Sequence, residues 1–529
     1  MTDFAWWQRG VIYQIYPRSF QDANGDGVGD LAGIRRRLDY LAWLGVDALW
    51  IPPIYPSPMA DFGYDIADHC AIDPLFGTLD EFDVLLAEAH ERGLRVILDF
   101  VPNHTSDRHP WFEEARRSRD APRRDWYLWA DPGADGGPPN NWRSHFGGAA
   151  WTFDPGSGQY YLHTFLAAQP DLNWRSPEVA EAMAQVMRFW LDRGVDGLRL
   201  DAIWHLIKDR HLRNNPPDPG WHPGLPEHEK LLHVFTSDRP EVQPLVCALR
   251  DVVDEYRERV LIGELYLPIE RVVAYYGARG NGIHLPANAL LIGAPWDAES
   301  IGAAADRYEA LLPTFGWPNW ALGNHDKPRI AGRVPRGHER LAALLLLTLR
   351  GTPTLYYGDE LGMRDGDIPP AAIQDPIERN MPGLGRGRDP QRTPMPWDDS
   401  PHAGFSTAEP WLPLSADGPR LHVAGQQADP ASLLHLYRRL LQLRRAESAL
   451  AVGRYLGHGA PAGTLHFERE HQGRRLAVAL NFNETARTLS GLAGQLVLST
   501  LGRDEGCALD GTLTLLPGEG AIVALAEQV

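Results

Sequence analysis

Cysteine is scarce in this chain of 529 residues, and its three cysteines, Cys70, Cys247 and Cys507, lie far apart. An odd number of widely scattered cysteines favours neither a disulfide framework nor a cysteine-rich metal cluster. Long apolar runs are missing as well, because the best of them, residues 341–349, is too short to span a bilayer. These absences are typical of an ordinary soluble globular protein.

Positive charge is also in short supply. The formal net charge of −18 argues against nucleic acid or an anionic membrane as the partner, because phosphate backbones are bound by basic surfaces. A neutral substrate is easier to accommodate. The N-terminal residues lack the basic start and apolar core of a secretion signal, so a cytoplasmic location is expected. The sequence leaves the oligomeric state open.

Several familiar catalytic motifs are absent from the sequence. The chain has no phosphate-binding loop, no nucleophile elbow and no Cys/His zinc cluster. His228 and His233 flank Glu229 but stand five residues apart, which turns them off a common helical face, unlike the four-residue spacing of zinc proteases. The glycines of residues 383–387 miss the dinucleotide-binding fingerprint.

Apolar runs typical of buried strands alternate with helical patterns along most of the chain. We expect eight strands, near residues 11–16, 46–51, 94–101, 196–201, 260–264, 283–292, 319–323 and 354–357. The sixth is irregular because Pro286 interrupts it. Eight strands with intervening helices predict a (β/α)8 TIM barrel, an α/β fold whose reactive groups sit at the C-terminal ends of the strands.

Two stretches break this alternation. Residues 105–171 hold Trp, Pro, Gly and Asn in irregular order and are too long for a connection, which predicts an inserted subdomain after the third strand. Residues 452–529 carry short alternating apolar runs and predict a C-terminal β-sandwich. Residues 1–104 and 172–451 would form the catalytic barrel. The long proline-rich segment 214–240 would wall a cleft.

Three of the expected strands lead into a carboxylate: Asp201, Glu264 and Asp326. Asp201 alone also fits the N-cap of a helix. Three such residues at strand ends, however, predict a cluster at one mouth of the barrel. Glycosidic cleavage needs this chemistry, one protonated carboxylic acid and one ionised carboxylate. Arg199 would lower the pKa of Asp201 and hold it as a nucleophile, whereas apolar neighbours would raise the pKa of Glu264.

Four strings carry a resemblance to the α-amylase superfamily, glycoside hydrolase family 13. They are residues 99–104, 197–201, 263–264 and 324–326, in that order at strand ends. The resemblance covers most of the chain. It implies that Asp201 is the nucleophile, that Glu264 is the acid/base, and that Asp326 grips the 2- and 3-hydroxyls of the sugar. It also places three further side chains in the sugar subsite next to the scissile bond: His104, Arg199 and His325.

Residues 169–173 and 388–397 are similar to strings of the oligo-1,6-glucosidase and α-glucosidase branch of this family. That similarity implies that Asp65 and Arg392 close the pocket around a terminal glucose. Such a pair can hold the 4- and 6-hydroxyls by charge-assisted hydrogen bonds. Tyr64 would offer its aromatic face to the ring. The alternative for Asp65 and Arg392 is a surface salt bridge.

A metal site is predicted near the N-terminus, where oxygen-bearing side chains recur at alternate positions between glycines. Such a loop can surround a hard cation, although Gly33 stands where an EF-hand has its last glutamate, and a Gly/Asn-rich turn is the alternative. The loop also resembles the metal loop of the same branch, which implies structural Ca²⁺, with Mg²⁺ as the other candidate. The implied ligands are Asp22, Asn24, Asp26, the carbonyl of Val28, and Asp30.

The sequence therefore predicts a retaining, exo-acting α-glucosidase that releases glucose from the non-reducing end of short α-glucosides through a covalent glucosyl-Asp201 intermediate. Ala202, next to the nucleophile, tilts the expected linkage towards α-1,4, by resemblance to α-1,4-preferring relatives. Transglucosylation, sucrose or trehalose chemistry and isomerisation share these residues and stay open. A non-catalytic carbohydrate-binding barrel is disfavoured, because such relatives lose the catalytic carboxylates.

Overall fold

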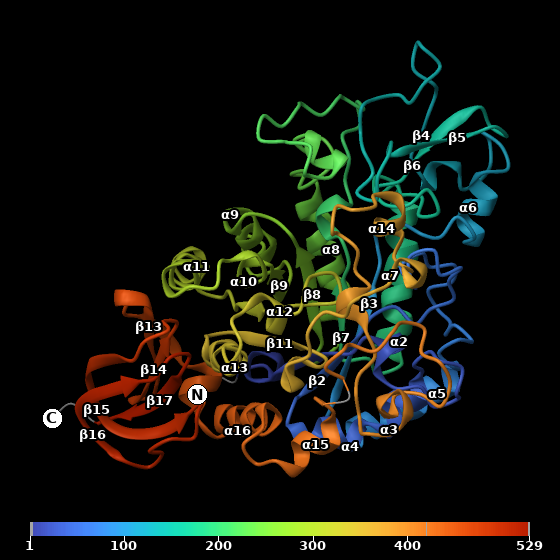
Figure 1. The fold of residues 1–529 in the computed structure, drawn as a ribbon. Helices are drawn as coiled ribbons and strands as arrows, with labels where there is room; N and C mark the ends of the chain where they lie inside the picture. Colours follow the sequence, from blue (N-terminus) through green and yellow to red (C-terminus); the bar gives the residue numbers. More distant parts are fainter. Residues whose placement is uncertain (1–3, 419, 527–529) are drawn as a thin grey trace.

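A computed structural model of the chain describes residues 4–418 and 420–526. Its centre is a closed barrel of parallel strands in the order β1-β11-β10-β9-β8-β7-β3-β2 (Figure 1), so the predicted (β/α)8 barrel is confirmed. The strands are β1 (Ile12–Gln14), β2 (Ala48–Ile51), β3 (Arg95–Phe100), β7 (Gly197–Leu200), β8 (Val260–Leu265), β9 (Leu285–Asn288), β10 (Asn319–Ala321) and β11 (Thr352–Tyr356).

Helices surround the barrel. The larger ones are α3 (Leu31–Arg36), α4 (Leu38–Leu44), α5 (Leu79–Glu91), α7 (Pro177–Asp192), α8 (Val242–Asp254), α11 (Ala298–Leu311), α13 (Glu339–Thr348) and α16 (Leu433–Ala446). Local sequence fixes where several of them begin. Thr78 and Glu81 form a capping box at the start of α5, and Ser176 caps α7 just before Pro177.

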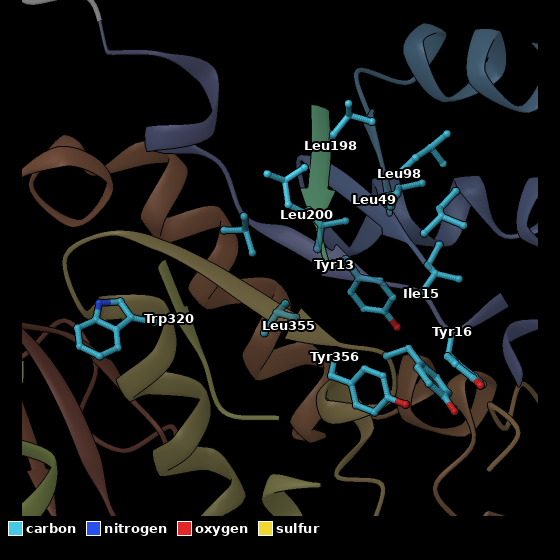
Figure 2. Packing of buried hydrophobic residues seen from close by; sticks show 14 of the residues in the cluster. Tyr13, Ile15, Tyr16, Leu49, Leu98, Leu198, Leu200, Trp320, Leu355 and Tyr356 are labelled. Carbon is cyan, nitrogen blue, oxygen red and sulfur yellow. The ribbon is translucent and has the colours of Figure 1, made fainter. Parts of the chain in front are cut away.

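Side chains on the barrel strands alternate between two environments. One set packs outward against the helices, and Figure 2 shows members of it from four neighbouring strands: Tyr13, Leu49, Leu98, Leu198 and Leu200. The other set points into the barrel and makes a separate apolar cluster that includes Ile12, Ala48, Ile97, Val260 and Ile262. The barrel interior is therefore a packed core.

Polar side chains continue the inward-facing rows towards the C-terminal ends of the strands. In β3, Asp99 follows Ile97 at a two-residue spacing, and in β8, Glu264 follows Ile262 in the same way. Arg199 takes the equivalent place in β7, where it is in register with Asp99. The strand period of two thus places charged groups directly above the apolar layer.

The segment between β3 and α7 carries a small sheet of its own. Its three strands, in the order β4-β6-β5, are β4 (Trp129–Ala130), β5 (Trp151–Asp154) and β6 (Gln159–Leu162). The chain enters and leaves this segment side by side, since His104 and Asp171 form an antiparallel bridge. This sheet lies above the C-terminal end of the barrel (Figure 1).

The C-terminal β-domain, predicted as a β-sandwich, lies at the opposite side of the molecule from β4, β5 and β6 (Figure 1). Along β14, Leu476, Val478 and Leu480 join the main core, whereas Ala477 and Ala479 belong to a cluster within the domain. The strands make one antiparallel sheet, in the order β12 (Arg454–Gly457), β13 (Thr464–His471), β14 (Arg474–Asn481), β17 (Gly520–Leu525), β15 (Arg487–Ser499) and β16 (Ala508–Leu515). Among the described residues, no helix is both long and apolar enough to cross a membrane.

Candidate active site

One guanidinium joins the carboxylates at the mouth of the barrel. Arg199 Nη1 lies 2.7 Å from Asp99 Oδ1 and 2.7 Å from Asp201 Oδ1, and its Nη2 lies 2.8 Å from Glu264 Oε1. All four side chains are buried. Because two nitrogens of one planar group touch Asp201 and Glu264, these two carboxylates lie within reach of a single sugar ring.

The backbone between the two carboxylates is unusual. Ala202 adopts a left-handed conformation with φ of 47°, which a residue with a Cβ rarely takes. This conformation lets the amide N–H of Ala202 donate to Glu264 Oε2 at 3.0 Å. The chain after β7 therefore helps to hold Glu264 beside Asp201, at the expense of local backbone strain.

Both carboxyls have raised pKa values. Burial, followed by the neighbouring Glu264, raises the pKa of Asp201 well above its ordinary value, and Arg199 only partly opposes this. Burial also raises the pKa of Glu264. Arg199 lowers the pKa of Asp201, as predicted, but in the free enzyme burial and a second carboxyl outweigh this one shared cation, so the pKa is raised overall. A pair of this kind titrates as a unit and retains one proton readily.

Asp326 is the carboxylate that stays ionised. Burial by itself would raise its pKa, but the charge that His325 carries in acid and the guanidinium groups of Arg388 and Arg392 outweigh that effect and hold the pKa well below the ordinary range. Arg392 Nη2 lies 2.7 Å from Asp326 Oδ1. The Asp326 side chain is 24% exposed, and it lines the pocket. It can accept two sugar hydroxyls as a permanent anion.

The predicted sugar-subsite residues Tyr64 and His325 form a stacked pair. Their rings are nearly parallel, with centroids 5.6 Å apart, and Tyr64 Oη lies 2.7 Å from His325 Nε2. Burial lowers the pKa of His325 to about 3, so the ring is neutral near pH 7. Tyr64 lines the pocket, whereas His325 is fully buried behind it.

His104 also lines the pocket. Its Nε2 lies 3.1 Å from the carbonyl oxygen of Tyr64 and 3.1 Å from Gln169 Nε2. Burial lowers its pKa to about 4. Gln169 Nε2 in turn donates to Asp61 Oδ2 at 3.2 Å. Neutral His104 is thus held by its neighbours at both ring nitrogens and brings no charge to the pocket.

The predicted ion pair between Asp65 and Arg392 is not formed. Asp65 is fully buried, and its carboxylate accepts hydrogen bonds from the amides of Ala60 and Asp61, both at 2.9 Å. It stabilises the turn that contains Gly63, whose φ of 107° favours glycine. Arg392 instead donates hydrogen bonds to the carbonyl oxygen of His325 and to the carboxylate of Asp326.

The ion pair in the pocket is instead Asp61 with Arg388, whose Nη2 lies 2.5 Å from Asp61 Oδ1. Both residues line the pocket, and sequence reasoning missed both. Asp61 and Asp65 flank the same turn, as Arg388 and Arg392 flank the same proline, so the right residue types were found at positions four residues away. The sequence did offer one signal for this choice. Aspartate favours turns that its own carboxylate stabilises, so one of the two aspartates could be expected to bond the turn and not the sugar.

These side chains surround a pocket of about 240 Å³, smaller than the roughly 300–1,000 Å³ typical of drug-sized ligands. Charged groups gather in it, as described above. The remaining lining is mostly apolar or imidazole and comes from the inserted segment, the loop after β7 and the loop after β11: Phe146, Phe165, Trp204, His205, Pro226, His228, Ile377 and Met381. The prediction that the long loop after β7 walls a cleft is confirmed.

The predicted metal loop is folded by its own hydrogen bonds. The carboxylate of Asp22 accepts the amides of Gly25 and Gly27, at 2.7 and 2.9 Å. Asp30 accepts the amide of Ala23 at 3.0 Å. Both aspartates are buried at the base of the loop.

The other predicted ligands lie at the exposed tip of the loop. Asn24 Oδ1 accepts the amide of Asp26 at 2.9 Å, and Asp26 Oδ1 accepts the amide of Val28 at 2.8 Å. Within residues 4–418 and 420–526, no group of three or more His, Cys, Asp or Glu side chains is gathered so that it could hold an ion. An ion here therefore needs the amide oxygen of Asn24 and the carbonyl oxygen of Val28 besides carboxylates.

The arrangement suits acid-assisted displacement at a sugar carbon. Two carboxyls that share a proton provide one acid and one nucleophile. A third, permanently ionised carboxylate stabilises positive charge that develops on the ring. The pocket is walled by Asp61 and Arg388 at one side, which favours a single terminal sugar over a chain passing through.

Comparisons with known proteins agree with this chemistry. Residues 14–453 match the family model described as "Alpha amylase, catalytic domain". The chain is 44% identical over 502 residues to a probable alpha-glucosidase of Rhizobium meliloti (strain 1021), covering 92% of this chain and 91% of that protein. It is 37% identical over 513 residues to an oligo-1,6-glucosidase of Halalkalibacterium halodurans, covering 90% of each.

A solved structure is similar over almost the whole chain. The crystal structure of the alpha-glucosyl transfer enzyme XgtA superposes with a TM-score of 0.92 at 42% sequence identity, covering 98% of this chain and all of that one. The likeness extends beyond the barrel, so the inserted segment and the C-terminal β-domain belong to the shared architecture.

Proposed function

This chain belongs to the α-amylase family of glycoside hydrolases, and we propose that it is a retaining, exo-acting α-glucosidase that removes one glucose from the non-reducing end of short α-glucosides. The observation that carries the proposal is the single pocket in which Asp201, Glu264 and Asp326 meet the ion pair of Asp61 and Arg388. The close similarity to a probable alpha-glucosidase and to an oligo-1,6-glucosidase supports it.

The reaction proceeds in two displacements. Glu264, protonated, gives its proton to the glycosidic oxygen while a carboxylate oxygen of Asp201 attacks the anomeric carbon and the bond to the leaving sugar breaks. Arg199 holds Oδ1 of Asp201, which leaves Oδ2 to attack. Glu264, now ionised, takes a proton from water, whose oxygen displaces Asp201 and releases glucose with its α configuration retained.

The pocket accounts for exo action. A terminal glucose presents its 4- and 6-hydroxyls at the end of the chain, and Asp61 and Arg388 can bond them with charge assistance. A preceding sugar unit would have to occupy the space taken by this buried ion pair. Product analysis on maltotetraose tests the proposal: glucose and maltotriose should appear first, whereas maltose as the first product from internal cleavage would contradict it.

A second candidate function is transfer of glucose to another hydroxyl compound. It is favoured by the structural likeness to the alpha-glucosyl transfer enzyme XgtA. Hydrolysis and transfer share the glucosyl-Asp201 intermediate and differ only in whether water or an acceptor alcohol attacks it. Incubation with maltose at rising concentration separates the two, since transfer yields trisaccharide in a proportion that grows with maltose.

The linkage preference is proposed to be α-1,4, on the basis of Ala202. Its small side chain follows the nucleophile and lines the pocket. Initial rates on maltose and isomaltose at equal concentration test this preference, and a higher kcat/KM for isomaltose would contradict it. The cytoplasmic location expected from the N-terminal residues stays a prediction.

We propose further that the loop of residues 22–30 holds a structural Ca²⁺ ion, or Mg²⁺. All its side-chain donors are oxygens, as a hard cation prefers, and glycines at positions 25 and 27 allow the tight wrap. Metal analysis of the purified protein and melting with and without chelator test this. Chelation should lower the melting temperature of the natural chain and leave Asp26→Ala unaffected. A metal-free protein with an unchanged melting temperature would overturn the proposal.

A further inference from the structure

We propose that Asp375 is a positioning residue that aims Arg388 at the sugar and thereby sets recognition of the terminal glucose. Asp375 is fully buried and lies outside the pocket lining, whereas Arg388 lines the pocket. The inference rests on the proposed function, because it concerns how that function's pocket is built. Asp375 itself touches no substrate atom, so its effect passes through Arg388.

The side-chain contacts of Arg388 are dominated by Asp375. Its Nε lies 3.2 and 3.1 Å from the two carboxylate oxygens of Asp375, and its Nη2 lies 2.8 Å from Oδ1. The same Nη2 reaches Asp61, and Nη1 lies 3.3 Å from Asp326. Asp375 therefore holds the inner edge of the guanidinium and leaves its far end directed to the pocket.

Asp375 also fixes the backbone that carries Arg388. Its Oδ2 accepts the amide N–H of Arg388 at 2.5 Å, and its Oδ1 accepts that of Ile377, at the start of α14 (Pro376–Asn380). Asp389 makes the reciprocal hydrogen bonds, because its carboxylate accepts the backbone amides of Gln374 and Asp375. The loop between residues 375 and 388 is thus closed at its base by two reciprocal aspartates.

This closed loop forms part of the pocket wall. Ile377, Met381 and Arg386, all within it, line the pocket. Asn380 Nδ2 donates to the carbonyl oxygen of Phe146, which ties the loop to the inserted segment at 3.1 Å. Figure 1 shows α14 beside the C-terminal ends of the barrel strands, below β4, β5 and β6. Asp375 lies at the junction where this wall meets Arg388.

The charge on Asp375 determines how the guanidinium of Arg388 is shared among the neighbouring carboxylates. Burial alone would raise the pKa of Asp375, but Arg388 outweighs it and holds the pKa below the ordinary value, so the carboxylate is ionised at neutral pH. Without that charge, Arg388 has two anionic partners left, Asp61 and Asp326, both within the pocket. The guanidinium would turn towards Asp326, which is needed to bind the 2- and 3-hydroxyls.

The test is a double-mutant cycle with Asp375→Asn and Arg388→Met in the full-length protein. Asparagine keeps one of the two oxygens that accept the backbone amides of Ile377 and Arg388, and it removes the charge that orients Arg388. Asp367→Asn is the matched control, an exposed aspartate in the same loop region. Hydrolysis of p-nitrophenyl α-glucoside and of its 4-deoxy and 6-deoxy analogues is measured for each variant, together with the melting temperature.

We expect D375N to lower kcat/KM on the glucoside by about tenfold or more, chiefly through KM, because a charge-assisted contact is lost. The preference for the glucoside over the deoxy analogues should shrink, and D375N should have no further effect in the R388M background. D367N should match the natural protein. If D375N does not fold, Asp375→Glu, which keeps the charge but displaces it, replaces it in the same cycle.

An equal loss from D375N in both backgrounds, or an unchanged preference for the hydroxyl groups, would overturn the inference and leave the proposed function intact. Absence of any hydrolysis of p-nitrophenyl α-glucoside by the natural protein would instead count against the proposed function itself.

Discussion

Asp61 and Arg388 form a buried ion pair in the pocket, with Arg388 Nη2 2.5 Å from Asp61 Oδ1. The two residues are 327 positions apart in the chain. Asp61 comes from the loop after β2 and Arg388 from the loop after β11, and the closed order of the barrel places β1 between these two strands. The barrel therefore brings together two side chains that can bind a sugar as a pair, which neither loop could supply alone.

Asp61→Asn is expected to lower kcat/KM on p-nitrophenyl α-glucoside by about 10- to 100-fold, because a hydrogen bond to a charged group contributes about 1.5–3 kcal/mol. Its melting temperature should fall only modestly, because Arg388 keeps the carboxylates of Asp375 and Asp326 as partners. Steady-state kinetics and thermal melting measure the two effects. Asp65→Asn is the matched comparison: its carboxylate accepts backbone amides in the turn, so it should lower the melting temperature more than D61N does. The reverse pattern would restore the Asp65 assignment.

Removing the shared cation has a different signature. Arg199→Met leaves Asp99, Asp201 and Glu264 buried without their guanidinium. The free energy of unfolding at pH 7 should fall by about 3–5 kcal/mol, the usual cost of a broken buried pair. Activity should fall by at least about a hundredfold, because the nucleophile is no longer held.

The pH dependence of this loss follows from the direction of the pKa shifts. Without Arg199, the buried carboxyls have folded-state pKa values raised further above their unfolded values. The folded variant then binds more protons than the unfolded chain, so its stability rises as pH falls from 7 towards 5. Denaturant unfolding at both pH values should show a smaller difference between R199M and the natural protein at pH 5. A difference that grows at pH 5 would contradict this account.

The sequence predicted the barrel because the barrel follows from short-range periodicity, and it predicted the three carboxylates because they stand at or after strand ends in motifs that resemble those of a known family. Strand alternation places Asp99, Arg199 and Glu264 on the inward face, and the closed parallel topology brings their ends together. A pattern of apolar runs is enough to recognise this arrangement. Even the irregular sixth strand forms as β9, with Pro286 inside it.

The assignment of loop residues was less accurate, because turn geometry depends on which aspartate faces inward. Asp65 and Asp61 lie on the same turn, and only the folded backbone shows that Asp65 accepts the turn's own amides. The pKa of Asp201 was also misjudged, since the sequence displays its neighbour Arg199 but not its burial beside Glu264. Tertiary contacts decided both cases.

Ala202 offers a test of stored backbone strain. Its φ of 47° is readily adopted by glycine. Ala202→Gly should therefore leave the free energy of unfolding unchanged or raise it by up to about 1 kcal/mol. Elsewhere in a chain, glycine usually lowers this free energy, because it increases the entropy of the unfolded state. Ala202→Val should lower the free energy of unfolding by at least about 1 kcal/mol, because a β-branched residue tolerates positive φ poorly. Chemical denaturation compares them, and a clear loss of stability in A202G would argue against strain at this position.

His69 should make stability depend on acidity. It is 3% exposed, it packs against His109 and Trp111, and burial lowers its pKa to about 4. Near pH 5 the unfolded chain protonates this histidine and the folded chain does not, so stability is lost as pH falls below about 6.5. The expected contribution between pH 7 and pH 5 is about 2 kcal/mol.

His69→Gln removes this titration. Unfolding free energies at pH 7 and pH 5 should then differ by about 2 kcal/mol less in H69Q than in the natural protein. His435→Gln is a suitable control, since its ring lies near the surface on α16. An identical pH dependence in H69Q and the natural protein would show that His69 is not held neutral by burial.

The central claim, that Asp201 attacks the sugar beside Glu264, is tested most directly by trapping the intermediate. In Glu264→Gln, α-glucosyl fluoride should still glucosylate the enzyme, because fluoride leaves without an acid, while removal of the sugar by water lacks its base. Mass spectrometry of the digested protein should find one anhydroglucose unit on the peptide that contains Asp201. A sugar attached to a different residue, or release of glucose in the β configuration by the natural enzyme, would contradict the account.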